Sequence, residues 1–437
     1  MPSGRPLSVC IFSKAYSAHR GGRFLWPFML VARQLAAIGH RVTVITTRHP
    51  DGAKRPIARI EQEPGISIHY LGAGRPEKTD RAYWRESAKT FDRLHLEQPF
   101  DIVMGRGRSS SGFLQYSRHA GTIPLISHEG TYPAWLHPYK ITRRRGIAGI
   151  FRHLARPIHA WLDARANRRH TACLTGSALV IANGAALADS IAETYWWRPP
   201  PARAIPYGFM ADDFLSIAAK PRFPARVQEL TDSGRRFVLY VGRVTRTKGA
   251  LDLLHALHAA GQEDVSLLVV GPMKKKNRKR LIQLALSLGL ARRLVLAGAV
   301  EHAFLPALLT RAEALLFPSL HPESLPKAVM EAMAAGLPVA GYRIPALAGM
   351  IDHGSEGFLA PPGDSAALGA LLGRLLREPA LAARMGHAAR RRIDRDGHPG
   401  RVDRLWQEAL ESVLPPVASR ERTGSIVEPR AALAVAS

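Results

Sequence analysis

The stretch PSLHPESLPKAVMEAMAAGLPV, residues 318–339, holds the pattern from which we predict the fold of this chain. A helix is expected over 327–335, because Pro326 stands at its start, apolar residues recur at helical spacing and a glycine follows its end. Apolar runs at 314–317 and 338–341 predict a strand on each side. This strand–helix–strand order is the building unit of a parallel sheet.

Similar units fill two parts of the chain, separated by a proline- and charge-bearing connector at 220–234. Parallel sheets with helices on both faces bind ligands at the carboxyl ends of their strands, so a cleft between the two parts is the expected site. The fold class predicted is α/β, with two Rossmann-like parallel-sheet domains facing a cleft. The expected strands are 7–12, 42–46, 66–71, 101–104, 123–127, 178–182 and 203–206 in the first part, and 237–241, 266–270, 293–296, 314–317, 338–341 and 356–360 in the second.

The domain boundaries follow from this alternation. We predict an N-terminal Rossmann-like domain over 1–205 and a C-terminal Rossmann-like domain over 206–395. A helix at about 396–412 is expected to pack back on the first domain. The remaining residues, 413–437, are rich in Ala, Arg and Ser without a clear period, so we expect them to be disordered.

Glu323 and Glu331 are the first candidate site residues. They lie eight positions apart, one before the predicted helix and one inside it, which on a helix corresponds to roughly 12 Å. A glycosidase pair needs a separation of ~5–9.5 Å, so that chemistry is not favoured. The spacing suits two contacts on one long ligand, with a phosphate between them at the helix N-terminus. A nucleotide-sugar has this form, since it joins a sugar, a diphosphate and a ribose.

In three further segments, polar residues or glycine follow the end of a predicted strand. The segment YVGRVTRTKG, 240–249, places Arg243 and Lys248 where a departing diphosphate would need positive charge. Gly22 closes a Gly-Gly pair after the first strand, and glycine lets a backbone approach a phosphate or sugar closely. His128, in ISHEG at 126–130, is expected at the carboxyl edge of its strand. A plain turn at Gly22 and a satisfied loop histidine at His128 remain open alternatives from the residues alone.

Together these motifs resemble the Glu-x7-Glu signature and the Gly-Arg-x5-Lys-Gly segment of the retaining GT-B glycosyltransferases, the family-4-like, group 1 class. The resemblance implies that Glu323 contacts hydroxyls of the donor sugar and that Glu331 contacts the ribose. It also implies that His128 faces the reaction centre, so His128 and Glu323 are the expected catalytic residues. The expected donor-binding residues are Gly22, Arg243, Lys248, Leu325, Pro326, Lys327 and Glu331.

The activity implied is transfer of a sugar from a UDP- or GDP-sugar to a saccharide or lipid-linked acceptor. Surface polysaccharide, lipopolysaccharide and glycolipid assembly are all open pathways. The resemblance implies same-face attack with retention of configuration. No cofactor beyond the nucleotide-sugar co-substrate and no metal are expected, because cations such as Arg243 and Lys248 take the part of a metal.

The formal net charge of +26 over 437 residues is the outlier of the composition. Nucleic acid, an anionic membrane surface and an acidic substrate are the partners that such charge allows. Residues 140–169 interleave arginines with apolar residues, and they are interpreted either as a membrane-surface helix or as a core-facing stripe with solvated arginines. The basic run at 274–280 lacks interleaved aromatic residues, so no nucleic-acid partner is predicted.

Localisation is predicted from the same composition. Cys10 and Cys173 lie in apolar runs and are expected to be buried free thiols of a reducing compartment. No secretory signal or membrane span is expected. We therefore predict a cytoplasmic protein and leave open a peripheral position on the inner membrane face.

Two alternative functions remain open. One is a non-catalytic scaffold that binds a nucleotide-sugar or a membrane, and the other is a GT-B-type epimerase. An epimerase would need acid–base carboxylates near the sugar and no acceptor. The variant Glu323→Ala separates an enzyme from a scaffold, because only an enzyme would lose a transfer activity.

Overall fold

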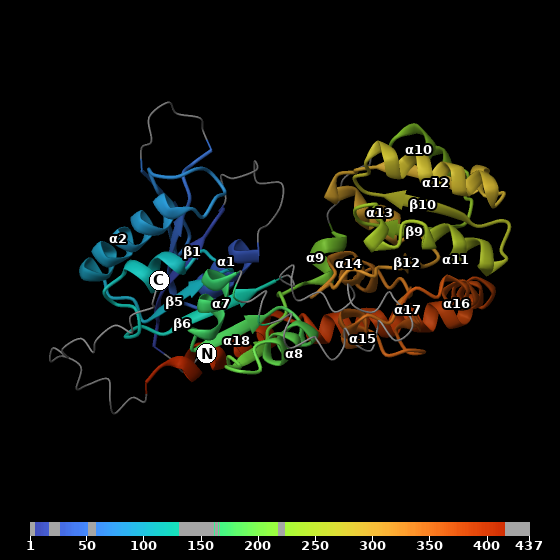
Figure 1. The fold of residues 1–437 in the computed structure, drawn as a ribbon. Coiled ribbons are helices and arrows are strands. Elements are labelled where there is room, and N and C mark those ends of the chain that lie inside the picture. The colour runs from blue at the N-terminus through green and yellow to red at the C-terminus, as the bar shows by residue number, and fades with distance from the viewer. Residues whose placement is uncertain are drawn as a thin grey trace.

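The computed structural model describes residues 5–16, 27–50, 58–130, 161, 165, 167–216 and 223–415. These residues form two lobes, each built around its own sheet (Figure 1). Gly22, most of the basic segment 140–169 and all residues after 415 lie outside the described residues. The predictions made for them are therefore not addressed by the structure.

The N-terminal sheet has eight strands in the described part of the chain, in the order β3-β4-β2-β1-β5-β6-β7-β8. All neighbours are parallel except β3 and β4. All six residues of β1 are buried, as expected of a strand covered on both faces. The strands are β1 (Ser8–Ser13), β2 (Arg41–Thr46), β3 (Arg59–Glu63), β4 (Ile66–Tyr70), β5 (Ile102–Gly105), β6 (Leu125–Glu129), β7 (Leu179–Ala182) and β8 (Ala202–Ala204).

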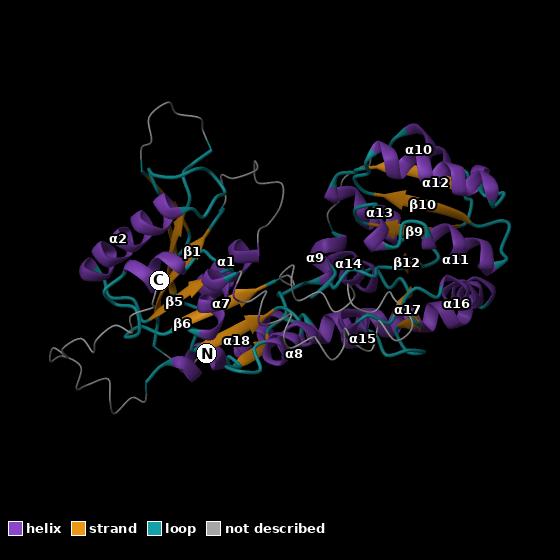
Figure 2. Ribbon diagram, viewed as in Figure 1, coloured by secondary structure: helices purple, strands orange, loops and turns teal. Residues whose placement is uncertain are grey.

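Helices cover both faces of this sheet (Figure 2). They are α1 (Pro27–Ala37), α2 (Arg81–Glu97), α3 (Ser111–Tyr116), α7 (Arg168–Thr175) and α8 (Ala185–Thr194). The two predicted buried thiols are both buried and free, although Cys173 lies in α7 and not in a strand.

Among the residues that the structure describes, the C-terminal sheet has six parallel strands in the order β11-β10-β9-β12-β13-β14. They are β9 (Phe237–Val241), β10 (Ser266–Val270), β11 (Leu294–Gly298), β12 (Leu315–Phe317), β13 (Val339–Tyr342) and β14 (Gly357–Ala360). The helices around them are α10 (Ala225–Asp232), α11 (Asp252–Ala260), α12 (Lys275–Ser287), α13 (Leu305–Leu309), α14 (Lys327–Ala334), α15 (Pro345–Met350) and α16 (Ser365–Arg377). The predicted fold class, with two parallel-sheet α/β domains, is confirmed.

The expected connector was wrongly predicted, and one strand of the first sheet was missed. Helix α10 lies inside the expected connector 220–234, and its Val227 and Leu230 are buried in the core of the second lobe. Strand β3 was not predicted, because its sequence RIEQE has no apolar face. It forms the antiparallel edge of the first sheet, where polar residues are tolerated.

Two chain segments cross between the lobes. The first, after β8, leads to α9 (Ala211–Leu215), and the second runs from α17 (Pro379–Asp396) into α18 (Pro399–Val413). The Phe209 amide donates to the Gly397 carbonyl at 3.0 Å, so the two crossings are tied together. Figure 1 shows α17 and α18 running from the second lobe back to the first.

Helix α18 completes the core of the N-terminal lobe. Val402, Trp406, Ala409 and Leu410 are buried in one cluster with residues of β1, β2 and α1. These four residues recur at helical spacing and face one side, which is the pattern of an amphipathic helix. The end of the described chain therefore belongs to the lobe in which the chain began.

Among the described residues, no helix combines the length and the apolar character needed to cross a membrane.

Candidate active site

The loop after β9 and the loop after β12 are joined at the carboxyl edge of the second sheet. The Leu320 amide donates to the Thr247 carbonyl at 2.9 Å. Gly249 has a φ of +71°, and a Cβ there would collide with the Pro318 carbonyl. Only glycine adopts this backbone conformation easily and also leaves room for the second loop. This explains why a glycine follows Lys248.

Lys248 and Glu323 meet across this junction. The Lys248 Nζ donates to Glu323 Oε1, and the Ser319 hydroxyl donates to the same oxygen at 3.0 Å. The side chains of Lys248 and Glu323 are 18% and 15% exposed. The structure thus brings together two predicted site residues that are far apart in the sequence, and it orients the carboxylate with two donors.

Arg243 precedes Lys248 on the loop after β9. It follows Gly242 at the end of β9, is exposed, and accepts a hydrogen bond at its backbone carbonyl from the Tyr240 hydroxyl at 2.9 Å. Burial raises the pKa of Tyr240, the negative charge of Glu323 adds to this effect, and the positive charge of Arg243 opposes it. Both charges therefore act on the same buried hydroxyl.

Glu331 lies inside α14 and is 4% exposed. Its Oε1 accepts a hydrogen bond from His302 Nε2 at 2.7 Å. The His302 ring is half-exposed and lies 5.7 Å from the Phe214 ring. His302 was not predicted, because nothing in the local sequence marks a residue that acts across 29 positions.

Helix α14 begins at Lys327, with Pro326 as its N-cap and no side chain capping its first amides. Unsatisfied amides and the helix dipole favour an anion at this end. Lys327 is exposed in the first turn, while Leu325 lies just before the cap and lines a cavity described below. The placement of these three residues is compatible with a bound phosphate.

His128 lies inside its strand, near the carboxyl end, and not directly after it. Strand β6 continues to Glu129, so His128 is inside the strand and is fully buried. Its ring stacks on Trp406 of α18 at 6.2 Å and 16°, and the Tyr207 ring lies 6.2 Å away. Burial, followed by the charge of Arg106, lowers the pKa of His128 to about 3, so the ring is neutral at neutral pH. A catalytic role for His128 stays a prediction.

The loop that carries Glu323 also touches the N-terminal lobe. The Ser324 hydroxyl donates to the Gly130 carbonyl at 2.6 Å. A Cβ on Gly184 would collide with the Ser324 carbonyl, so the glycine permits the approach. The predicted sugar contact therefore lies next to the boundary between the lobes.

Sequence reasoning missed a buried pair at this boundary. Glu129 Oε1 accepts from His170 Nε2 at 3.0 Å and from the Gly107 amide at 3.1 Å. Burial raises the pKa of Glu129, but His170, Arg106 and the Gly107 amide together outweigh burial and lower it. Glu129 is therefore a carboxylate at neutral pH.

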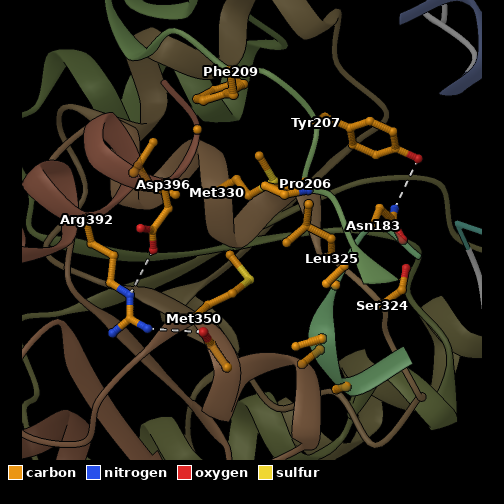
Figure 3. Close-up of a pocket in the computed structure, with 18 of the residues that line it drawn as sticks. Asn183, Pro206, Tyr207, Phe209, Ser324, Leu325, Met330, Met350, Arg392 and Asp396 are labelled. Carbon is orange, nitrogen blue, oxygen red and sulfur yellow. Dashed lines mark hydrogen bonds and ion pairs between the residues drawn. The ribbon is translucent and has the colours of Figure 1, made fainter. Parts of the chain in front are cut away.

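A cavity of about 270 Å³ lies between the lobes beside the two crossings (Figure 3). Its wall is mainly apolar and includes Pro206, Leu325, Met330 and Met350. Of the predicted donor-binding residues Leu325 lines it, whereas Arg243, Lys248, Glu323 and Glu331 do not. Among the described residues, no group of three or more His, Cys, Asp or Glu is arranged to hold a metal ion.

Two family models match this chain. Residues 28–208 match the glycosyl transferase 4-like domain, and residues 222–392 match the glycosyl transferases group 1. The two matches fall on the N-terminal and C-terminal lobes. They leave only the chain termini and the crossing between the lobes unmatched.

Comparisons with individual proteins also find glycosyltransferases. The 2-deoxystreptamine N-acetyl-D-glucosaminyltransferase of Streptomyces fradiae is 34% identical over 155 residues, which are 34% of this chain and 36% of the relative. This match thus spans only about a third of that relative's length. The MMP alpha-(1->4)-mannosyltransferase of Mycolicibacterium hassiacum is 25% identical over 412 residues, covering 88% of this chain and 93% of the relative.

A solved structure shows the same architecture. Anabaena Alr3699/HepE in complex with UDP and glucose superposes with a TM-score of 0.61 at 16% identity, over 93% of this chain and 100% of that chain. Such low identity shows the fold alone. From the two family models, the two-lobed fold and these relatives together, we conclude that the chain belongs to the group 1 glycosyl transferases.

Proposed function

We propose that this chain transfers a sugar from a nucleoside diphosphate sugar, UDP- or GDP-linked, to a saccharide or lipid-linked acceptor. The observation that carries the proposal is the contact between Lys248 and Glu323, with Arg243 on the same loop as Lys248. A carboxylate can bind sugar hydroxyls, and a cation can bind phosphate. The two groups side by side therefore suit a ligand that joins a sugar to a phosphate. UDP is the first nucleotide to test, because the Anabaena neighbour holds it.

The chemistry proposed is a replacement at the anomeric carbon on one face of the sugar. The bond between this carbon and the diphosphate oxygen breaks, and a bond to the acceptor oxygen forms on the same side. The proton of the acceptor passes to the departing phosphate oxygen, so the donor configuration is retained. The nucleotide-sugar is the only co-substrate in this scheme.

The residues of the second lobe stabilise the leaving group. Negative charge grows on the diphosphate as the bond breaks, and in this proposal Arg243, Lys248 and the uncapped amides at the start of α14 bind it. Glu323 positions a sugar hydroxyl and does not act as an acid or a base. Glu331, held by His302, binds the ribose.

The acceptor belongs to surface polysaccharide, lipopolysaccharide or glycolipid biosynthesis in this proposal. The excess of positive charge supports a place at the cytoplasmic face of an anionic membrane. Flotation with anionic and neutral vesicles at low and moderate salt tests this part. Equal flotation with both kinds of vesicle would contradict it.

Donor binding is the decisive experiment. UDP-, GDP- and ADP-sugars are titrated into the full chain, into Lys248→Ala and into the control Lys275→Ala, whose lysine is exposed on α12. We expect one nucleotide-sugar to bind the wild type and the control, and to bind Lys248→Ala at least about tenfold more weakly. If the wild type binds none of them, or Lys248→Ala binds as well as the wild type, the proposed donor site is wrong.

A further inference from the structure

Arg106 is a cation that is not part of the proposed donor site. It comes directly after β5, at the carboxyl edge of the N-terminal sheet, and its side chain is partly buried. Its backbone amide donates to the Ser109 hydroxyl at 2.7 Å. Within the described residues its guanidinium forms no ion pair and no hydrogen bond. A guanidinium without a protein partner keeps its donors available for an anionic ligand.

The nearest carboxylate does not supply that anion. Glu129 is on the neighbouring strand, and the charge of Arg106 acts on it. Its carboxylate, however, accepts hydrogen bonds from His170 and from the Gly107 amide, and Arg106 makes no ion pair with it. The buried carboxylate is thus satisfied by other donors, while the guanidinium is left for a ligand.

Tyr207 brings a second donor to the same place. A Cβ built on Gly130 would lie 3.0 Å from Arg106 Nη2 and 3.0 Å from the Tyr207 hydroxyl oxygen. Since both atoms are this close to one point, they are at most 6.0 Å apart. The Tyr207 hydroxyl accepts from Asn183 Nδ2 at 3.1 Å, as Figure 3 shows, so its proton is available to donate. A side chain at position 130 would crowd both groups, so the glycine lets the two donors lie close to its backbone.

The two donors face the loop that carries Glu323. The carbonyl of Gly130 accepts from Ser324, the residue after Glu323. Arg106 and Tyr207 therefore lie on the N-terminal side of the boundary, across from the residue proposed to bind the donor sugar. The donor's own phosphates are bound from the other lobe, by Arg243, Lys248 and α14. An anion at Arg106 would thus belong to the other substrate.

We infer that Arg106 and Tyr207 form a subsite for an anionic group, a phosphate or a carboxylate, on the acceptor. The inference rests on the proposed transferase function and narrows its acceptor class. The planar guanidinium donates two parallel hydrogen bonds to such a group, which an ammonium cannot do, and the tyrosine hydroxyl donates a third.

The test compares matched probes that differ in charge. The UDP-loaded or GDP-loaded full chain is titrated with glucose, glucose 6-phosphate and glucuronate. The variants are Arg106→Gln, Arg106→Lys, Tyr207→Phe and the control Arg108→Gln, whose arginine is exposed on the same loop. Melting curves and nucleotide affinity are measured for each variant, so that a folding defect is recognised.

We expect the wild type and Arg108→Gln to bind at least one anionic probe about tenfold or more tightly than glucose. Arg106→Gln should lose this preference, Arg106→Lys should keep part of it, and Tyr207→Phe should weaken it less than Arg106→Gln. The two anionic probes distinguish a phosphate from a carboxylate subsite.

Equal binding of the three probes by the wild type would overturn the inference, as would an undiminished preference in Arg106→Gln. Failure of the transferase proposal has a different signature, namely that the wild type binds no nucleotide. In that case the anion preference is measured on the nucleotide-free protein, with the same variants and the same criteria.

Discussion

His302 and Glu331 are joined by a hydrogen bond of 2.7 Å between the Nε2 of the histidine and the Oε1 of the carboxylate. The histidine is half-exposed on the loop after β11, whereas the glutamate is buried in α14. The exposed residue thus fixes the orientation of the buried one. A second oxygen of Glu331 remains for the ribose that it is proposed to bind.

His302 is therefore predicted to be a positioning residue for the donor. His302→Ala should raise the donor KM about three- to tenfold, since one hydrogen bond to a charged group is lost, with little change in kcat. His302→Gln, which can still donate to Glu331, should restore most of the affinity. A loss of kcat alone, or no rescue by Gln, would contradict this role.

Glu323 and Lys248 should separate transfer from nucleotide binding. Glu323→Ala is expected to lower transfer by about a hundredfold or more, because the sugar is no longer oriented for attack. UDP or GDP binding should persist in this variant, since Lys248 is then released from its ion pair. Transfer rates and calorimetric nucleotide affinity are both measured, with Ser319→Ala as the milder control. Undiminished transfer in Glu323→Ala would favour the scaffold alternative.

Gly249 offers a matched pair of glycine variants. Gly249 and Gly261 have φ values of +71° and +68°, but a Cβ collides with Pro318 only at Gly249, while nothing lies within 4 Å at Gly261. Gly261→Ala should cost about 1 kcal/mol of unfolding free energy through backbone strain alone. Gly249→Ala should cost more and should also weaken nucleotide binding, because the loops of Lys248 and Glu323 are pushed apart. Equal effects in denaturant titration and calorimetry would show that the loop contact is unimportant.

His128 should make the protein sensitive to acid. Its pKa is about 3 in the folded protein, below its ordinary value of 6.5, so the unfolded chain takes up the proton first. Its contribution to stability is full above pH 6.5 and falls as the pH drops toward 3, by at most about 1.4 kcal/mol per pH unit. Denaturant unfolding of the wild type and of His128→Phe between pH 7.5 and pH 4 measures this. The variant should show the shallower decline, and parallel curves would mean that His128 titrates normally.

Trp406 should anchor the end of the chain to the first lobe. It is 2% exposed and stacks on His128. Trp406→Ala should lower the unfolding free energy of the N-terminal lobe by about 3–5 kcal/mol, whereas Trp406→Phe should cost less because most of the volume is kept. Differential scanning calorimetry should show the loss in the transition of that lobe. An unchanged thermogram would mean that α18 contributes little to its core.

The sequence was most informative where the pattern is local. Strands β9 and β10 have the predicted bounds, because apolar runs act over neighbouring positions. The second lobe was predicted more closely for this reason. Helix α10 was predicted to be a connector because it has few apolar positions. Strand β3 was not predicted because an edge strand need not be apolar.

The sequence by itself determined the two-lobed parallel-sheet class and the order of the strands apart from β3. It also singled out the motif residues from Arg243 to Glu331 as candidates. Only the tertiary structure decided what these residues touch. It buried His128 beneath Trp406, placed His302 on Glu331 and left Arg106 without a partner among the described residues. The physical reason is range: hydrophobic periodicity and capping are properties of a few consecutive residues, whereas burial and ion pairing depend on segments that meet only after the sheets have formed.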